Sequence, residues 1–213
     1  MSAAGRSERG GEGRDLFPTP PDLAAVLAAL FPFAGRVFEP SAGPGRIVRA
    51  LNLCGVTPDA VELHPSHQKQ LAPLCARVTI GSFLHYGRDP SERGYDWIVG
   101  NPPFAGGRDH IAHALYLLRP GGVLAFILPA SILTPAAARP LRAGLARRYE
   151  LEERPGFTDD GQTDASDYAI FVWKRGYRAE TVARYISWRG PNAAADLQQC
   201  RDYDWPMWRA TVA

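Results

Sequence analysis

This chain of 213 residues has few cysteines, no long apolar run and no strong excess of one charge. Its three cysteines are scattered, and none has the spacing of a disulfide framework or of a Cys/His metal site. We therefore expect reduced thiols, a cytoplasmic protein and no bound metal. No apolar run reaches the roughly 18 residues that a membrane helix needs, and the start of the chain lacks the apolar segment of a signal peptide. A membrane partner is not expected.

The charge of the chain is nearly balanced. The formal net charge is only +2 at pH 7, so no global basic character indicates a polyanion partner, although a local patch would be enough. Hydrophobic residues make up 46% and charged residues 22% of the chain, which is typical of a globular protein. Glycine, serine and charge dominate the start, which predicts a disordered tail at 1–14. We expect one domain at 15–176 and a C-terminal extension at 177–213.

Apolar segments of strand length alternate with segments of helical spacing along the chain. Strands are expected at 36–39, 59–62, 77–80, 95–100, 122–129, 149–154 and 168–174. Helices are expected at 22–31, 46–53, 112–118 and 139–148, with Asp22 capping the first. This alternation predicts an α/β fold, with a doubly wound and mostly parallel sheet of seven strands in a single domain. Ligands bind such sheets beyond the carboxyl ends of the strands.

Two turns at expected strand ends have the residues of an adenosine-cofactor site. In the segment Glu39-Pro40-Ser41-Ala42-Gly43-Pro44-Gly45, the glycines let the backbone pass close to a ligand. Glu62 ends the next strand, where a carboxylate can bind both ribose hydroxyls. The third glycine of a dinucleotide motif is absent, and Glu39 would repel a pyrophosphate. The charge pattern therefore favours S-adenosylmethionine, whose sulfonium and ammonium groups tolerate the acid. A tight turn without a ligand is the alternative.

A third motif, Asn101-Pro102-Pro103-Phe104, follows the strand expected at 95–100. An aromatic amino group is a poor nucleophile because its lone pair is delocalised into the ring. Two hydrogen-bond acceptors aimed at the amino hydrogens make the lone pair of the nitrogen available. The Asn101 side-chain oxygen and the Pro102 carbonyl can be these two acceptors. The prolines stiffen the loop and so preorganise these acceptors. Phe104 offers a flat face on which a flipped-out base can stack. A common turn with Phe104 in the core is the alternative.

With these motifs in this order, the chain resembles the class I S-adenosylmethionine-dependent methyltransferases from Phe17 to about Trp173. The Asn-Pro-Pro-Phe motif most resembles the N6-adenine DNA methyltransferases, in their gamma-type arrangement. The resemblance implies that the cofactor is bound by Phe17, Thr19, Glu39, Pro40, Ala42, Gly43, Gly45, Glu62, Leu63, Ser82, Phe83 and Asn101. Ser82 stands where the family often has an acid, which weakens that contact. By the same resemblance, Phe157 helps Phe104 to hold the flipped base; a loop anchor packed on the sheet is the alternative for Phe157.

The resemblance implies methyl transfer to the exocyclic amino group of adenine in DNA. Specificity would be short or relaxed, because few residues follow the domain. Arg108 is an expected substrate contact; further candidates are His110, Arg139, Arg142, Arg147, Arg148, Arg178, Arg184, Trp188, Arg189, Trp205, Trp208 and Arg209. The alternative to substrate contact is that the extension at 177–213 is an amphipathic segment that packs on its own domain. Two other functions stay open: an RNA base methyltransferase, with DNA the favoured partner, and a non-catalytic subunit that needs a partner.

Overall fold

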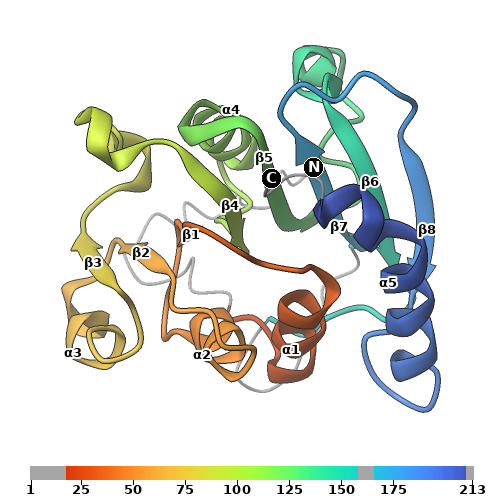
Figure 1. The fold of residues 1–213 in the computed structure, drawn as a ribbon, viewed down its shortest axis with the longest axis horizontal. Helices are drawn as coiled ribbons and strands as arrows, with labels where there is room; N and C mark the ends of the chain where they lie inside the picture. Colours follow the sequence, from red (N-terminus) through yellow and green to blue (C-terminus); the bar gives the residue numbers. More distant parts are fainter. Residues whose placement is uncertain (1–17, 158–165, 210–213) are drawn as a thin grey trace, which may run out of the picture.

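The computed structural model describes residues 18–157 and 166–209, which form one sheet with helices on both faces (Figure 1). The strands are β1 (Val37–Glu39), β2 (Asp59–Glu62), β3 (Arg77–Ile80), β4 (Tyr95–Gly100), β5 (Leu118–Pro129), β6 (Leu145–Leu151), β7 (Tyr168–Lys174) and β8 (Val182–Ile186). The α-helices are α1 (Pro21–Leu30), α2 (Arg46–Leu53), α3 (Gln68–Leu71), α4 (Gly107–Leu117) and α5 (Ala193–Arg209). Short 3-10 helices are η1 (Pro65–His67), η2 (Phe83–His85), η3 (Pro90–Glu92) and η4 (Ala136–Arg142). The expected tail at 1–14 lies outside the described residues.

The strands are ordered β3-β2-β1-β4-β5-β7-β6-β8 across the sheet. Strands β1 to β5 pair in parallel, β7 runs antiparallel between β5 and β6, and β8 pairs in parallel with β6. The α/β fold with a mostly parallel, doubly wound sheet is confirmed. The strand number was wrong, because the described residues form eight strands and not seven. β8 has mostly exposed side chains at the edge of the sheet, so it lacks the apolar alternation that would predict it.

Alternate residues of the central strands point to opposite faces and fill two cores. On one face, Trp97 and Val99 of β4 pack with side chains of α1, α2 and α5. On the other face, Ile98 of the same strand packs with side chains of α4. Figure 1 shows α1 and α2 on one side of the sheet and α4 on the opposite side. Cover on both faces explains why β5 and β7 are almost wholly apolar.

The region before β6 differs from the sequence-based prediction. A helix was expected at 139–148, but the chain forms η4 and then enters β6 at Leu145. Pro140 lies inside η4, and its ring and missing N–H prevent a continuous α-helix there. β6 therefore begins before 149–154, where the strand was expected.

The starts of α1 and α4 also differ from prediction. Asp22 does not cap α1, since the N-cap is Pro20 and Asp22 lies in the first turn after Pro21. Proline is well suited to this first position because its fixed φ already matches the helix. Helix α4 begins at Gly107 and not at 112, and it ends at Leu117, since Leu118 already belongs to β5.

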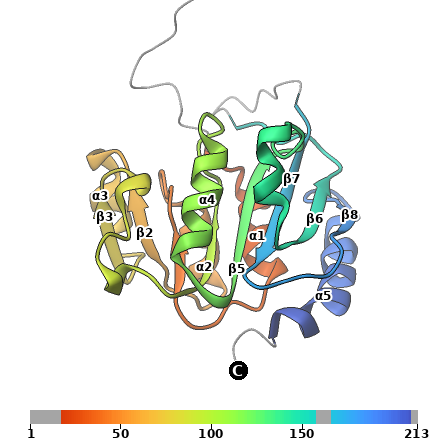
Figure 2. The same ribbon diagram turned by 90° about the horizontal axis from the view of Figure 1, so that it is seen from above.

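Residues 177–209 supply an edge strand and a helix to the same fold. β8 lies beside β6, and α5 contacts α1 and β8 (Figure 2). Asp204 of α5 is only 1% exposed. Its carboxylate accepts hydrogen bonds from Arg147 Nε at 2.6 Å and from the Tyr149 hydroxyl at 2.7 Å. Trp208 of the same helix is fully buried in the core. A contact between this segment and substrate stays a prediction.

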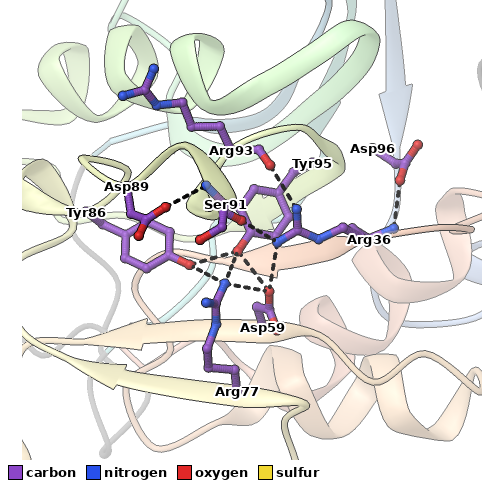
Figure 3. Close-up of polar contacts among 9 residues, drawn as sticks. All are labelled: Arg36, Asp59, Arg77, Tyr86, Asp89, Ser91, Arg93, Tyr95 and Asp96. Carbon is purple, nitrogen blue, oxygen red and sulfur yellow. Dashed lines mark hydrogen bonds and ion pairs between the residues drawn. The ribbon is translucent and has the colours of Figure 1, made fainter.

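A polar network joins β1 to β4 at their amino ends (Figure 3). Asp59 accepts a hydrogen bond from the Tyr95 hydroxyl at 2.8 Å and pairs with Arg77 at 3.3 Å. Arg77 also donates to the Tyr86 hydroxyl at 2.8 Å. The Arg36 guanidinium lies over the Tyr95 ring, 4.4 Å from its centroid. Burial raises the pKa of Tyr95, so its hydroxyl stays a donor. These contacts fix the strands relative to one another and so align their carboxyl ends at the other edge.

Candidate functional site

A cavity of about 280 Å³ lies at the carboxyl ends of β1, β2, β3 and β4. Its walls come from the segment before α1, the turn after β1, the end of β2, the start of η2 and the loop after β4. These segments are far apart in sequence and meet because parallel strands end at the same edge of the sheet. The turns that the sequence predicted as ligand-binding therefore converge on one cavity.

The turn after β1 is joined to the end of β2 through Glu62. Gly43 adopts a φ of 51° and Gly45 a φ of 80°, in the left-handed region that favours glycine. The Gly43 N–H donates to Glu62 Oε2 at 2.7 Å, and the His64 N–H donates to Oε1 at 2.8 Å. Each carboxylate oxygen has a second lone pair, so Glu62 can still accept hydrogen bonds from ligand hydroxyls. A Cβ at Gly43 would meet no atom within 4 Å, so space for a ligand is open there.

Glu39 is a buried carboxyl group at the bottom of this cavity. Its side chain is 2% exposed, and Oε2 has no hydrogen-bond partner within the described residues. Burial, and then the neighbouring charge of Glu62, raise the pKa of Glu39 well above its ordinary range. An ionised carboxylate in such a place is stable only beside a positive charge. The orphaned oxygen and the open space at the Gly43 turn therefore fit a cationic ligand.

Asn101 follows β4 and is held against the segment that precedes α1. Its Nδ2 donates to the Thr19 hydroxyl oxygen at 3.2 Å, and both side chains are buried. In this orientation of the amide, Oδ1 is the acceptor end. Arg46 Nη1 donates to the Thr19 carbonyl at 3.2 Å and so holds that segment in place. Pro102 and Pro103 continue the lining beside Asn101.

Three aromatic rings pack together beside the loop after β4. The Phe104 ring centroid lies 5.4 Å from that of Phe157 and 5.2 Å from that of Tyr168. Phe157 and Tyr168 are buried, and their centroids lie 4.8 Å apart. Phe104 is half-buried and is not part of the cavity lining. The structure thus packs Phe104 and Phe157 together, with Phe157 inside the core. A role for the two rings in holding a base stays a prediction.

Most of the predicted site residues line the cavity, namely Thr19, Glu39, Pro40, Ala42, Gly43, Glu62, Leu63, Ser82, Phe83, Asn101, Pro102 and Pro103. Gly45 is not in the lining but is the N-cap residue of α2. Arg108 is exposed in the first turn of α4, outside the lining. Phe17 lies outside the described residues. Their roles in binding stay predictions.

The lining residues that the sequence-based cofactor set omitted include the polar side chains Arg46, His64 and His110. His110 was expected only as a substrate contact. Burial lowers its pKa, so the imidazole is neutral near pH 7. Its ring centroid lies 5.5 Å from that of Phe83, which places it against the cavity wall. A histidine four residues into a helix that follows a loop has no distinguishing sequence pattern, so only the fold reveals this position.

Many of the arginines proposed as nucleic-acid contacts are engaged within the chain. Arg184 lies over the Tyr203 ring, 4.7 Å from its centroid, and Arg189 lies 4.9 Å from the Trp188 ring centroid. Arg147 pairs with Asp204. Trp188 is buried, at 4% exposed. These groups therefore contribute to packing in the structure. Among the described residues there is no group of three His, Cys, Asp or Glu side chains that could hold a metal, and no helix there is long and apolar enough to span a membrane.

No family profile and no curated protein matches the sequence. Solved structures do match its fold. A Listeria monocytogenes protein assigned to the class I S-adenosylmethionine-dependent methyltransferases has a TM-score of 0.66 at 12% identity, over 89% of this chain and 72% of its own. The type IIG restriction endonuclease BpuSI has a TM-score of 0.66 at 17% identity, over 96% of this chain and 30% of its own.

An RNA methyltransferase from Salinibacter ruber, solved with S-adenosyl-L-homocysteine, has a TM-score of 0.50 at 17% identity, over 76% of this chain and 97% of its own. At such low identities the similarity concerns the fold alone. The chain therefore has the fold of the class I S-adenosylmethionine-dependent methyltransferases, and its cavity occupies the carboxyl edge of that sheet.

Proposed function

We propose that the protein is an S-adenosylmethionine-dependent methyltransferase that modifies the exocyclic amino group of adenine in DNA. The observation that carries the proposal is the position of Asn101, which shares one cavity with Glu39, Gly43 and Glu62. An acceptor for an amino group and a binding place for a cationic adenosine cofactor thus border the same cavity. Neither half of the site alone would favour amino-group methylation.

The chain's own residues fit the cofactor by shape and charge. The orphaned Oε2 of Glu39 favours a positive charge on the ligand, and the Gly43 turn leaves room for it. Glu62 can accept hydrogen bonds from two ribose hydroxyls. Leu63 is 61% exposed at the cavity wall, an apolar surface that a bound purine would cover. The bound cofactor supplies a methyl group on a sulfonium, and a thioether leaves when the amino nitrogen attacks.

Asn101 is the group that makes the lone pair of the amino nitrogen available to attack. Its Oδ1 accepts a hydrogen bond from the amino group and pulls the nitrogen toward tetrahedral geometry. The Pro102 carbonyl is a second acceptor, and the two prolines keep both acceptors in place without reorganisation. With the cofactor bound, these acceptors would hold the amino nitrogen while its bond to the methyl carbon formed and the carbon–sulfur bond broke, and one amino proton would pass to solvent.

Adenine in DNA is favoured over other amino-group substrates for two reasons. The motif ends in the half-buried Phe104, whose ring could stack on a flipped base, typically about 1–3 kcal/mol per stacked base. BpuSI, a restriction endonuclease, shares the fold over nearly the whole of this chain. A base methyltransferase of RNA is the second candidate, because an RNA methyltransferase also shares the fold.

The proposal is tested with cofactor labelled in its methyl group. The protein is incubated with unmethylated single-stranded DNA, duplex DNA or structured RNA, and retained label is measured. We expect DNA to be labelled, and Asn101→Ala to lower the rate by roughly 10²–10³-fold while calorimetry shows that the variant still binds the cofactor. Asn101→Asp, which keeps an acceptor oxygen, is the matched variant for shape. An Asn101→Ala protein with full activity would exclude the mechanism, and labelling of RNA alone would select the second candidate.

A further inference from the structure

A second hollow lies on the edge of the sheet opposite the cavity. It has a volume of about 720 Å³ and is formed by the end of η4, the start of β6 and the segment after β7. Because β7 is antiparallel to β5, its end at Lys174 pairs with Val123 near the amino ends of the parallel strands. We call this hollow the basic groove.

Four basic residues from two segments of the chain line the basic groove. Its lining includes Arg142 from η4, Lys174 from the end of β7, and Arg175 and Arg178 just after it. No aspartate or glutamate is part of this lining. Within residues 18–157 and 166–209, none of the four cations forms an ion pair with an acid. The nearest acid in sequence, Glu180, is exposed and outside the lining.

Backbone carbonyls, and not carboxylates, hold these cations in position. Arg142 Nη2 donates to the Leu133 carbonyl at 2.7 Å, and Lys174 Nζ donates to the Met207 carbonyl at 3.1 Å. Arg175 donates to the Leu118 carbonyl. A neutral acceptor orients a cation but leaves its charge uncompensated. Partial burial also lowers the pKa of Lys174, with no acid nearby to raise it.

Some arginines elsewhere in the fold are paired with acids. Arg147 lies 2.6 Å from Asp204, and Arg77 lies 3.3 Å from Asp59. No acid lines the basic groove, so its basic residues attract an anion, and phosphate groups match arginine and lysine donors well.

We propose that the basic groove binds the phosphate backbone of a nucleic-acid strand, as a second contact at the edge opposite the cavity. This inference rests on the proposed function for its choice of nucleic acid among phosphate-bearing ligands. Arg178 is exposed in the groove lining, and within the described residues it forms no hydrogen bond, ion pair or ring contact, which leaves it available for a phosphate.

The test is binding of fluorescent 25-nucleotide DNA and RNA strands to the full chain, without cofactor, over a range of salt concentrations. The double variant Lys174→Gln and Arg178→Gln removes two charges. Arg88→Gln is the matched control, since Arg88 is exposed and lies outside the groove. For a single strand each lost phosphate contact lowers the slope of log K against log salt by about 0.7. We expect the double variant to bind at least about tenfold more weakly near 0.1 M salt, and Arg88→Gln to bind as the wild type does.

Equal affinity and equal salt slope in the wild type and the double variant would overturn the inference. So would loss of binding to inorganic pyrophosphate in the variant with unchanged binding to the strands, which would assign the groove to a free phosphate ligand. Arg178→Gln alone, at an exposed position, keeps the test valid if the double variant unfolds. Cofactor titration of the same proteins separates the two proposals, because the double variant should bind S-adenosylmethionine normally. If the wild type binds no S-adenosylmethionine but the double variant still binds nucleic acid more weakly than the wild type does, the proposed function is contradicted and the inference about the basic groove is not.

Discussion

At the scale of single residues, two carboxylates share one cavity but are held in opposite ways. Glu62 accepts two backbone N–H donors, from Gly43 and His64. Glu39 has an oxygen without a partner in the described part of the chain, and its pKa is raised first by burial and then by Glu62. The free protein thus keeps one site ready for hydroxyls and another that a cation would complete.

Glu39→Gln should separate the stability of the free protein from cofactor affinity. The raised pKa means that ionising Glu39 costs folding free energy, so wild-type stability relative to the variant falls as pH rises above the ordinary value of 4.5 toward the folded pKa. We expect the variant to melt at the same or a higher temperature near pH 7. A charged hydrogen bond contributes about 1.5–3 kcal/mol, so cofactor binding should weaken about tenfold or more.

The pH dependence of binding gives this prediction its second readout. Binding of a cationic ligand requires the ionised form of Glu39, so wild-type affinity should increase as pH rises until the free carboxyl is ionised. The glutamine variant should show no such increase. Calorimetry between pH 5 and 8 measures both. A variant that binds S-adenosylmethionine as tightly as the wild type at every pH would show that Glu39 does not face the cofactor's charge.

Gly43→Ala tests the open space at the turn after β1. Alanine at a φ of 51° is strained by roughly 1–2 kcal/mol. Gly55→Ala is a matched control, because Gly55 has a φ of 79° and its added Cβ also meets nothing within 4 Å. Thermal melting should show a similar loss of stability in both variants. Cofactor affinity should fall only in Gly43→Ala, since that Cβ occupies the ligand's space. Equal cofactor affinity in the two variants would mean that the ligand does not approach this turn.

At the scale of elements, the sequence predicted strands well where both faces are buried. β2, β4 and β7 lie where the apolar runs placed them. The edge strand β3 was also predicted, because Val78 and Ile80 keep an alternating apolar pattern. The pattern failed at the other edge of the sheet. β8 pairs only with β6 and has exposed side chains, so its sequence resembles a loop. The helix expected at 139–148 illustrates the converse, because arginines and alanines have helical propensity but Pro140 and pairing with β7 decide the structure.

Asp204 should determine whether α5 stays attached to the sheet. It accepts hydrogen bonds from Arg147 and Tyr149 of β6, and it is nearly inaccessible to solvent. Asp204→Ala leaves the Arg147 charge without its partner, which typically costs about 3–5 kcal/mol. Asp202→Ala is the control, since Asp202 is exposed and bonded only by Gln198. Urea unfolding measures both, and a loss below about 0.5 kcal/mol at Asp204 would contradict the role given to this contact.

At the scale of the whole molecule, two edges of one sheet carry different chemistry. The cavity was predictable because parallel strands bring their carboxyl ends together, so separate turns in the sequence had to converge. The basic groove was not, because Arg142 and Arg178 approach each other only through the pairing of β6 with β7 and β8. Phe104 is an intermediate case. Its place after β4 was predictable, but its packing against Phe157 and Tyr168 depends on the strand β7.

The central claim is that Asn101 directs a methyl group to the N6 amino nitrogen of adenine in DNA. The most direct test digests DNA to nucleosides after incubation with methyl-labelled cofactor and identifies the labelled nucleoside by chromatography and mass. The account predicts that the label elutes as N6-methyldeoxyadenosine with wild-type protein and is lost with Asn101→Ala. Label in cytosine, in guanine or in no deoxynucleoside, from a protein that binds the cofactor, would contradict it.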